Sequence, residues 1–167
     1  TEDLLIELEL ELARGPVAVV TLRERRDLGA AREFCLLSYL RFVHGYACWA
    51  CDSRLSLLRV GLPFARPPHG DVYPLLFPGP VQFGAATAHL AFDAKYLALP
   101  QKRDETALRA MLQRALPLTV RQYRRDRLLV QRVRRLLAVD LSATPDAAEV
   151  ARRAFVSTRS LHRHLRQ

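Results

Sequence analysis

The chain has 167 residues, of which half are apolar and 26% are charged, so it is long enough for one sizeable core or for one domain with a small appendage. This composition excludes a disordered chain, and three cysteines are too few for a disulfide scaffold. The few, clustered cysteines indicate a reducing, cytoplasmic setting. The sequence contains neither an apolar run of about 18 residues nor a basic leader before an apolar stretch, so we expect no membrane partner.

Charge is distributed unevenly along the chain. Residues 1–120 hold 14 lysines and arginines against 13 acidic residues, whereas residues 121–167 hold 12 arginines against 4 acidic residues. This asymmetry is typical of a phosphate-binding appendage on a nearly neutral domain, although a basic tail that only aids solubility gives the same counts. If the tail binds nucleic acid, the expected phosphate contacts are Arg124, Arg125, Arg127 and Arg132.

Residues 4–12 alternate strictly between apolar side chains and glutamates. This period of two predicts a strand with one buried face, formed by Leu4, Ile6, Leu8, Leu10 and Leu12. A turn at residues 14–16 leads to a second predicted strand at 17–23, and the two should form an antiparallel hairpin. Arg23 and Arg25 are expected to lie across from the glutamates and to offset their mutual repulsion.

Residues 29–53 predict a long helix that is apolar nearly all round, which indicates a core helix packed on more than one side. One face of this helix carries Arg41, His44, Cys48 and Cys51 at helical spacing. The spacing matches part of a zinc site or a redox pair, but the sequence offers no further ligand pair, and these cysteines sit at the wrong end of the helix for a lowered thiol pKa. We therefore expect packed or half-exposed thiols, with no metal and no cofactor.

The middle of the chain predicts a strand, a short helix, two strands joined by a turn, and a helical turn, at residues 56–62, 69–77, 80–83, 88–92 and 93–97. Two amphipathic helices follow at 104–116 and 127–141, with a boundary near 117–126 where Pro117 ends the first helix and the charge balance shifts. The expected fold class is α+β, with an antiparallel sheet packed on a long core helix and followed by a small all-α unit.

Residues 146–167 predict two short helices joined by a turn. Asp146 begins the first helix, with Glu149 in the capping-box position, and the Ser157 hydroxyl begins the second. The positions that two crossed helices would bury are Val150, Ala151, Val156, Leu161 and Leu165, and the outer face of the second helix holds Thr158, Arg159, His162, Arg163 and Arg166. A helix held in this way is the element that enters a major groove, although many helical hairpins without a nucleic-acid role also carry solvated arginines.

The run ARRAFVSTRSLHRHL at residues 151–165 resembles the first helix-turn-helix of AraC-type transcription regulators, whose usual form is close to A-R-R-L-G-M-S-x-R-T-L-x-R-x-L. The chain departs from this pattern at Phe155, where the family often has glycine; glycine tolerates a positive φ and phenylalanine does not, so we expect a slightly strained turn. The resemblance implies base readout by Arg159, His162 and Arg163, with Ser157, Thr158 and Arg166 as further DNA-binding positions.

Residues 64–100 carry a second resemblance, to the arabinose-binding-like regulatory domain of one branch of these regulators. The matching features are R-P-x-H, then Y-x-x-L-F, then P-V-x-F-G, and a closing Leu-x-Leu-Pro. Together the resemblances imply a regulatory domain at 1–120, the first helix-turn-helix at 126–167, further residues before Thr1 and a second helix-turn-helix after Gln167. A single reading helix predicts weak DNA binding with little sequence preference, at about 10⁻⁴–10⁻⁶ M.

We therefore expect a DNA-binding transcription regulator and not an enzyme, with double-stranded DNA and a small-molecule effector as partners and a homodimer as one allowed assembly. Two alternatives stay open at this point. The first is a stand-alone α+β ligand-binding or protein-interaction domain with an incidental basic tail, and the second is an enzyme that uses Cys48 and Cys51. If the regulator is correct, both cysteines are dispensable for DNA binding.

Overall fold

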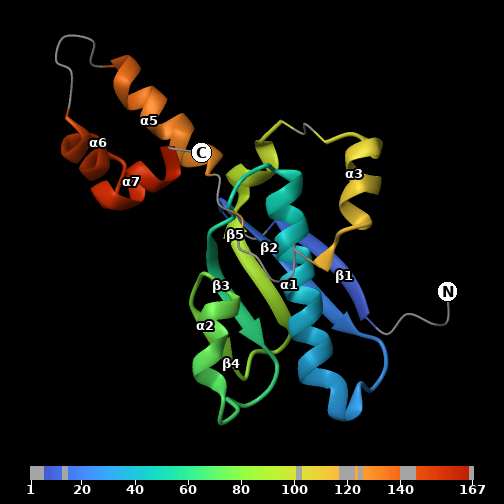
Figure 1. Cartoon of the computed structure of the whole chain (residues 1–167). Coiled ribbons are helices and arrows are strands. Elements are labelled where there is room, and N and C mark those ends of the chain that lie inside the picture. The colour runs from blue at the N-terminus through green and yellow to red at the C-terminus, as the bar shows by residue number, and fades with distance from the viewer. Residues whose placement is uncertain are drawn as a thin grey trace.

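The computed structural model describes residues 6–12, 15–100, 103–116, 123, 126–139 and 146–165, with the side chains of residues 138, 139, 163 and 164 excepted (Figure 1). The sequence predictions that fall outside these residues include the burial of Leu4, the end of a helix at Pro117, the phosphate contacts of Arg124 and Arg125, and a DNA contact by Arg166.

A five-stranded sheet forms one layer of the fold, in the order β1-β2-β5-β3-β4. Its strands are β1 (Ile6–Leu12), β2 (Val17–Glu24), β3 (Leu57–Leu62), β4 (Val81–Phe83) and β5 (Ala88–Asp93). The predicted hairpin of β1 and β2 is confirmed, with Leu8 opposite Leu22 and Leu10 opposite Val20. Strand β5 pairs antiparallel with both β2 and β3.

The prediction of an antiparallel sheet was wrong at one pairing, because β4 runs parallel to β3. Between these strands the chain passes through η2 (Gly70–Val72) and α2 (Tyr73–Leu76), and this crossover brings it back before β4 begins. The sheet is therefore mixed, and β4 forms one of its edges.

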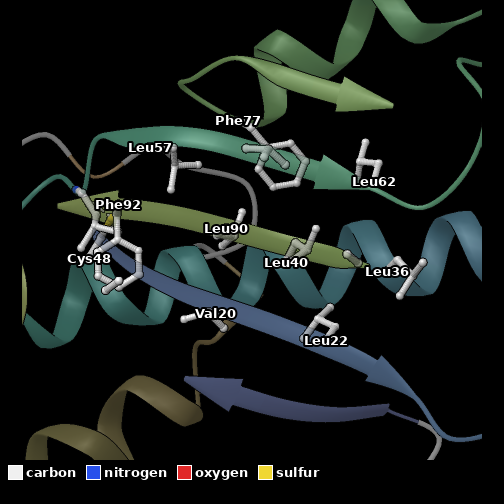
Figure 2. Packing of buried hydrophobic residues seen from close by; sticks show 14 of the residues in the cluster. Val20, Leu22, Leu36, Leu40, Cys48, Leu57, Leu62, Phe77, Leu90 and Phe92 are labelled. Carbon is white, nitrogen blue, oxygen red and sulfur yellow. Dashed lines mark hydrogen bonds between the residues drawn. The ribbon is translucent and has the colours of Figure 1, made fainter. Parts of the chain in front are cut away.

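Helix α1 (Arg32–Ala50), preceded by the short turn η1 (Gly29–Ala31), lies across one face of the sheet (Figure 1). Figure 2 shows Leu36 and Leu40 of this helix meeting Val20, Leu22 and Leu90 of the central strands, and all five side chains are buried. The expected packing on more than one side was wrong, since Phe34 is exposed and Tyr46 is partly so. The buried residues of α1 are Leu36, Leu40, Arg41, His44, Gly45 and Cys48.

The edge strand β1 is less buried than its alternating pattern predicted. Leu8, Leu10 and Leu12 point to the same side as the buried residues opposite them, yet they are between 49% and 71% exposed, while Ile6 is buried. The glutamate face behaves as predicted: Arg23 Nε donates to Glu9 Oε2 at 2.5 Å, and Arg25 pairs with Glu7.

The remaining elements are η3 (Ala94–Ala98), α3 (Glu105–Leu112), α5 (Arg127–Val139), α6 (Ala147–Arg153) and α7 (Thr158–Leu165). Helix α3 begins directly after Asp104, where the predicted helix starts, but it stops at Leu112, four residues before the predicted end. Helices α5, α6 and α7 gather beyond one end of the sheet (Figure 1) around a second apolar cluster. The α+β fold class is confirmed, and none of the helices in the described residues is long and apolar enough to cross a membrane.

Candidate nucleic-acid interface

Helices α6 and α7 begin at the two predicted caps. The carboxylate of Asp146 accepts a hydrogen bond from Glu149 N at 2.7 Å, and the hydroxyl of Ser157 accepts one from Ser160 N at 3.1 Å. Each bond satisfies one of the backbone donors that a helix start leaves without a partner. The reciprocal half of the predicted capping box is replaced, because the Glu149 side chain pairs with Arg152 and Arg153 instead.

The turn between the two helices is a Schellman motif. Val156 N donates to Ala151 O at 3.0 Å and Phe155 N donates to Arg152 O at 3.0 Å, so the last carbonyls of α6 are satisfied. Phe155 has a φ of 56°, the left-handed conformation for which glycine is favoured, which supports the predicted strain in this turn. Its side chain is 89% exposed, so packing within the described residues does not offset the strain.

A small apolar core holds the two helices together and joins them to α5. Its buried members are Leu129, Val133, Val150, Ala151, Ala154 and Leu161, with Leu136 and Val156 packed against it. The predicted burial of Leu165 was wrong, since this side chain at the end of α7 is 45% exposed. Arg132 Nη1 donates to Ala154 O at 3.0 Å, so this arginine braces the end of α6 and is not simply a free phosphate contact as expected.

Four of the sequence-predicted DNA contacts lie on the first turns of α7 or at its cap. Ser157, Thr158, Arg159 and His162 are all exposed, while the Arg163 side chain and the whole of Arg166 lie outside the described residues. An exposed arginine on such a helix can donate two hydrogen bonds to a guanine, and serine or threonine hydroxyls can bind phosphates or bases. The exposed side chains of α7 are therefore chemically capable of donating hydrogen bonds to a duplex.

Sequence reasoning missed the junction that ties α5 to the sheet-bearing part of the chain. Ser53, a fully buried residue after α1, accepts a hydrogen bond through its hydroxyl from Arg127 N at 2.9 Å. Arg127 Nη1 in turn donates to Cys51 O at 2.9 Å and to Pro100 O at 3.3 Å. The first residue of α5 is thus bound by a segment more than seventy residues earlier, and Arg127 is turned inward, against its expected role as a phosphate contact.

A second set of bonds at this junction involves Asp52, which has a φ of 48°. Its carboxylate accepts hydrogen bonds from Tyr123 Oη and from Arg103 Nη2, the latter at 3.2 Å. The Arg103 guanidinium also lies over the Trp49 ring, 5.3 Å from its centroid. Burial, together with the bond to Asp52, raises the pKa of Tyr123 to about 12, so its phenol remains a donor at neutral pH. No short-range sequence signal marks these contacts, because each one joins distant segments.

We expect Ser53→Ala to lower the free energy of unfolding by about 1 kcal/mol, because Arg127 N loses the acceptor that caps α5. Hydrogen exchange at the Arg127 amide should accelerate by more than exchange in the sheet does. Ser38→Ala, the same change in the middle of α1, is the matched control. Equal effects of the two substitutions would show that Ser53 does not act as a cap.

Arg41 and His44, which share one face of α1, form a buried polar network beside this junction. Arg41 Nη1 lies 3.1 Å from His44 Nδ1, and His44 Nε2 lies 2.8 Å from Leu55 O. Since arginine can only donate, Nδ1 must accept and the ring proton must reside on Nε2, which donates to Leu55 O. Burial lowers the pKa of His44 to about 4, and the nearby Arg41 charge acts in the same direction. The imidazole is therefore neutral at pH 7 and holds the segment that leads to β3.

Cys48 and Cys51, on the same face of α1, behave as packed thiols. Cys48 is buried and accepts a hydrogen bond from Leu55 N at 3.2 Å, whereas Cys51 is half-buried. Burial raises the pKa of Cys48 to about 11 and also raises that of Cys51, which opposes the thiolate form that zinc binding and redox exchange require. Within the described ranges no group of histidine, cysteine and acidic side chains could hold a metal ion.

Comparison with known proteins gives one family and two relatives. Residues 1–101 match the family model of the N-terminal arabinose-binding domain of AraC transcription regulators. The chain is 30% identical over 159 residues to the ornithine utilization regulator of Pseudomonas aeruginosa, an alignment that covers 95% of this chain and 47% of that protein. The chain therefore spans about half the length of this curated relative.

Among solved structures, the transcriptional regulator CdpR from Pseudomonas aeruginosa is 22% identical and covers 97% of this chain and 53% of its own, with a TM-score of 0.44. The match over residues 1–101 spans the whole sheet and α1, so it rests on the part of the chain that carries the larger core.

Proposed function

The chain belongs to the AraC family of transcription regulators, since the family's arabinose-binding domain matches well over half of it, and from this premise we propose that it binds double-stranded DNA through α6 and α7. In this proposal α6 and α7 form a helix-turn-helix within a DNA-binding unit at 126–167, and residues 1–120 form a regulatory domain that senses a small molecule. The protein acts by binding and not by catalysis, in the cytoplasm.

The single observation that carries the DNA-binding proposal is the geometry of α7. This helix has a defined start at Ser157 and a buried inner residue, Leu161, and it is locked to α6 by a satisfied turn. Its outer side presents Thr158, Arg159 and His162 to solvent. A helix presented in this way fits the major groove, and we propose base readout by Arg159, His162 and Arg163, with Ser157, Thr158 and Arg166 as supporting contacts.

Binding of a small-molecule effector would act by shifting a population between conformations that differ in DNA affinity. We also propose that two copies of the chain associate, with the exposed face of Leu8, Leu10 and Leu12 on β1 as the surface that a second copy covers. These leucines continue the apolar face of the sheet to its edge. Sedimentation of the chain over a concentration series tests whether two copies associate.

The DNA-binding proposal is tested by reversing charge on α7. Fluorescence anisotropy with a random-sequence duplex, measured over a salt series, should give an affinity that falls steeply with salt. Arg159→Glu combined with Arg163→Glu should weaken binding at low salt by at least about tenfold, because two proposed base contacts are lost and two negative charges face the duplex. A log–log slope that also flattens by about one unit for each of the two arginines would identify them as phosphate contacts and contradict the proposed base readout.

The matched control is Arg59→Glu combined with Arg109→Glu, which changes the net charge by the same amount on β3 and α3. This control should keep most of the affinity and the original salt slope. If both double variants weaken binding equally, only the net charge matters, and the chain is better described as a ligand-binding or interaction domain with an incidental basic tail.

A further inference from the structure

A cavity of about 690 Å³ lies between the sheet-bearing part of the chain and the α5–α7 cluster. On one side it is lined by η3 and the residues around it, and on the other by α5 and one residue of α6: Asp93, Lys95, Ala98, Leu99, Leu128, Gln131, Arg132, Arg135, Leu136 and Arg153. Its volume falls within the range of about 300–1,000 Å³ that small-molecule sites occupy. We call it the junction cavity.

The apolar wall of the junction cavity connects the two cores of the protein. Leu99 and Leu128 pack against the larger core beneath the sheet, whereas Leu136 packs against the core of α5, α6 and α7. A molecule in contact with all three side chains would therefore bury apolar surface on both parts at once. Such burial favours a ligand with an apolar body, by about 25 cal/mol for each Å² removed from water.

The polar wall is strongly basic. Lys95, Arg132, Arg135 and Arg153 line the cavity together with a single carboxylate, that of Asp93. Lys95 Nζ lies 3.8 Å from Asp93 Oδ2, and Arg153 Nε donates to Glu149 Oε1 at 2.6 Å, so these two cations already have acidic neighbours. Arg132 and Arg135, which line the cavity from α5, have no acidic partner within the described part of the chain. Arg132 donates one hydrogen bond to the carbonyl of Ala154, and Arg135 makes neither a hydrogen bond nor an ion pair there.

Arg132 and Arg135 lie three residues apart on α5, so both side chains project from the same face of that helix. Guanidinium groups bind carboxylates through paired N–H donors, and such charge-assisted bonds are stronger when water is partly excluded.

We propose that the junction cavity binds a small organic carboxylate, whose apolar body lies on Leu99, Leu128 and Leu136 and whose carboxylate pairs with Arg132 and Arg135. The inference rests on the proposed function, because it assigns a site and a chemical class to the effector of the regulator. A ligand that contacts both η3 and α5 would restrict motion of the α5–α7 cluster relative to the sheet, on either side of the Ser53–Arg127 hydrogen bond. Binding in the cavity would thereby be coupled to the orientation of α7.

The test uses the whole chain and measures binding by isothermal titration calorimetry with benzoate and octanoate, and with benzamide and octanamide as neutral analogues of the same shape. At least one carboxylate should bind, and its amide should bind at least tenfold more weakly. Arg135→Gln should weaken carboxylate binding by at least tenfold, while Arg134→Gln, on the neighbouring residue that does not line the cavity, should leave it unchanged. Ala98→Trp, which fills space in the cavity without a change of charge, should also weaken binding.

Three results would overturn the proposal: no binding of either carboxylate, equal affinities for a carboxylate and its amide, or equal losses in the Arg134 and Arg135 variants. The salt-dependent DNA binding of the same preparation separates this proposal from the previous one. Intact DNA binding without carboxylate binding removes only the junction site. Carboxylate binding without any DNA binding removes the proposed function and leaves a carboxylate-binding protein.

Discussion

Acidification from pH 7 to pH 4 is expected to lower the free energy of unfolding by on the order of 3 kcal/mol through His44 alone. In the folded chain burial lowers the pKa of His44 to about 4, against an ordinary value of 6.5. Between these two values the unfolded chain takes up a proton that the folded chain does not. The contribution is therefore fully present above pH 6.5, declines as the pH falls, and is lost entirely below about pH 4.

The structural reason is the environment of the ring. His44 is buried, its Nδ1 accepts from Arg41 and its Nε2 donates to Leu55 O, so a second proton would place two positive charges together away from water. Protonation should loosen the segment from Cys51 to Leu55, which holds both Leu55 and the Ser53 cap of α5. We expect hydrogen exchange in this segment to accelerate at lower pH before the sheet is affected.

Urea unfolding at pH 7, 5.5 and 4.5 measures the effect, with His44→Gln as the variant. This substitution should cost stability at pH 7, because the network is disturbed, but it should remove most of the acid-dependent loss in that range. His162→Gln, an exposed histidine on α7, should keep the full loss. Carboxylates such as Glu33, whose pKa is lowered mainly by the Tyr73 hydroxyl, contribute at lower pH and are shared by every variant. A parallel pH dependence in His44→Gln and the parent would refute the role of His44.

Leu161→Ala is expected to destabilise the α5–α7 cluster by about 2–5 kcal/mol, the usual cost of removing a buried leucine side chain. Leu161 is 2% exposed and packs with Val150 and Ala154, within a cluster that has six buried members. A core of this size has little capacity to absorb a cavity, so α6 and α7 should separate or fray. If α7 reads DNA, affinity should fall together with this unfolding.

Leu165→Ala is the matched control, because it makes the same change on the same helix at a side chain that is 45% exposed. It should cost well under 1 kcal/mol. Thermal unfolding should show a low-temperature transition for Leu161→Ala and no such transition for Leu165→Ala. The melting of the larger core beneath the sheet should change little in both variants, because that core is formed by other residues. Comparable effects of the two substitutions would mean that the small core is not organised around Leu161.

Local patterns in the sequence determined most of the elements and several of their boundaries. The alternation of residues 6–12 predicted a strand because side chains of a strand alternate between its two faces. Asp146 and Ser157 predicted helix starts because a cap bonds to a backbone group only three residues away. Phe155, where the family often has glycine, predicted strain in the turn because a positive φ is a property of one residue and its own side chain.

Contacts between distant segments were decided only by the tertiary structure. The alternation in β1 specified which leucines share a face, but their exposure depends on β1 being the edge strand, which no local pattern encodes. The parallel pairing of β3 and β4 likewise depends on the path of the chain through α2. The pattern of positive charge marked Arg127 and Arg132 as surface cations, whereas the fold gives each of them a carbonyl acceptor. The Ser53 cap and the junction cavity depend on segments that meet only when the chain has folded, so their residues carry no signal in the sequence alone.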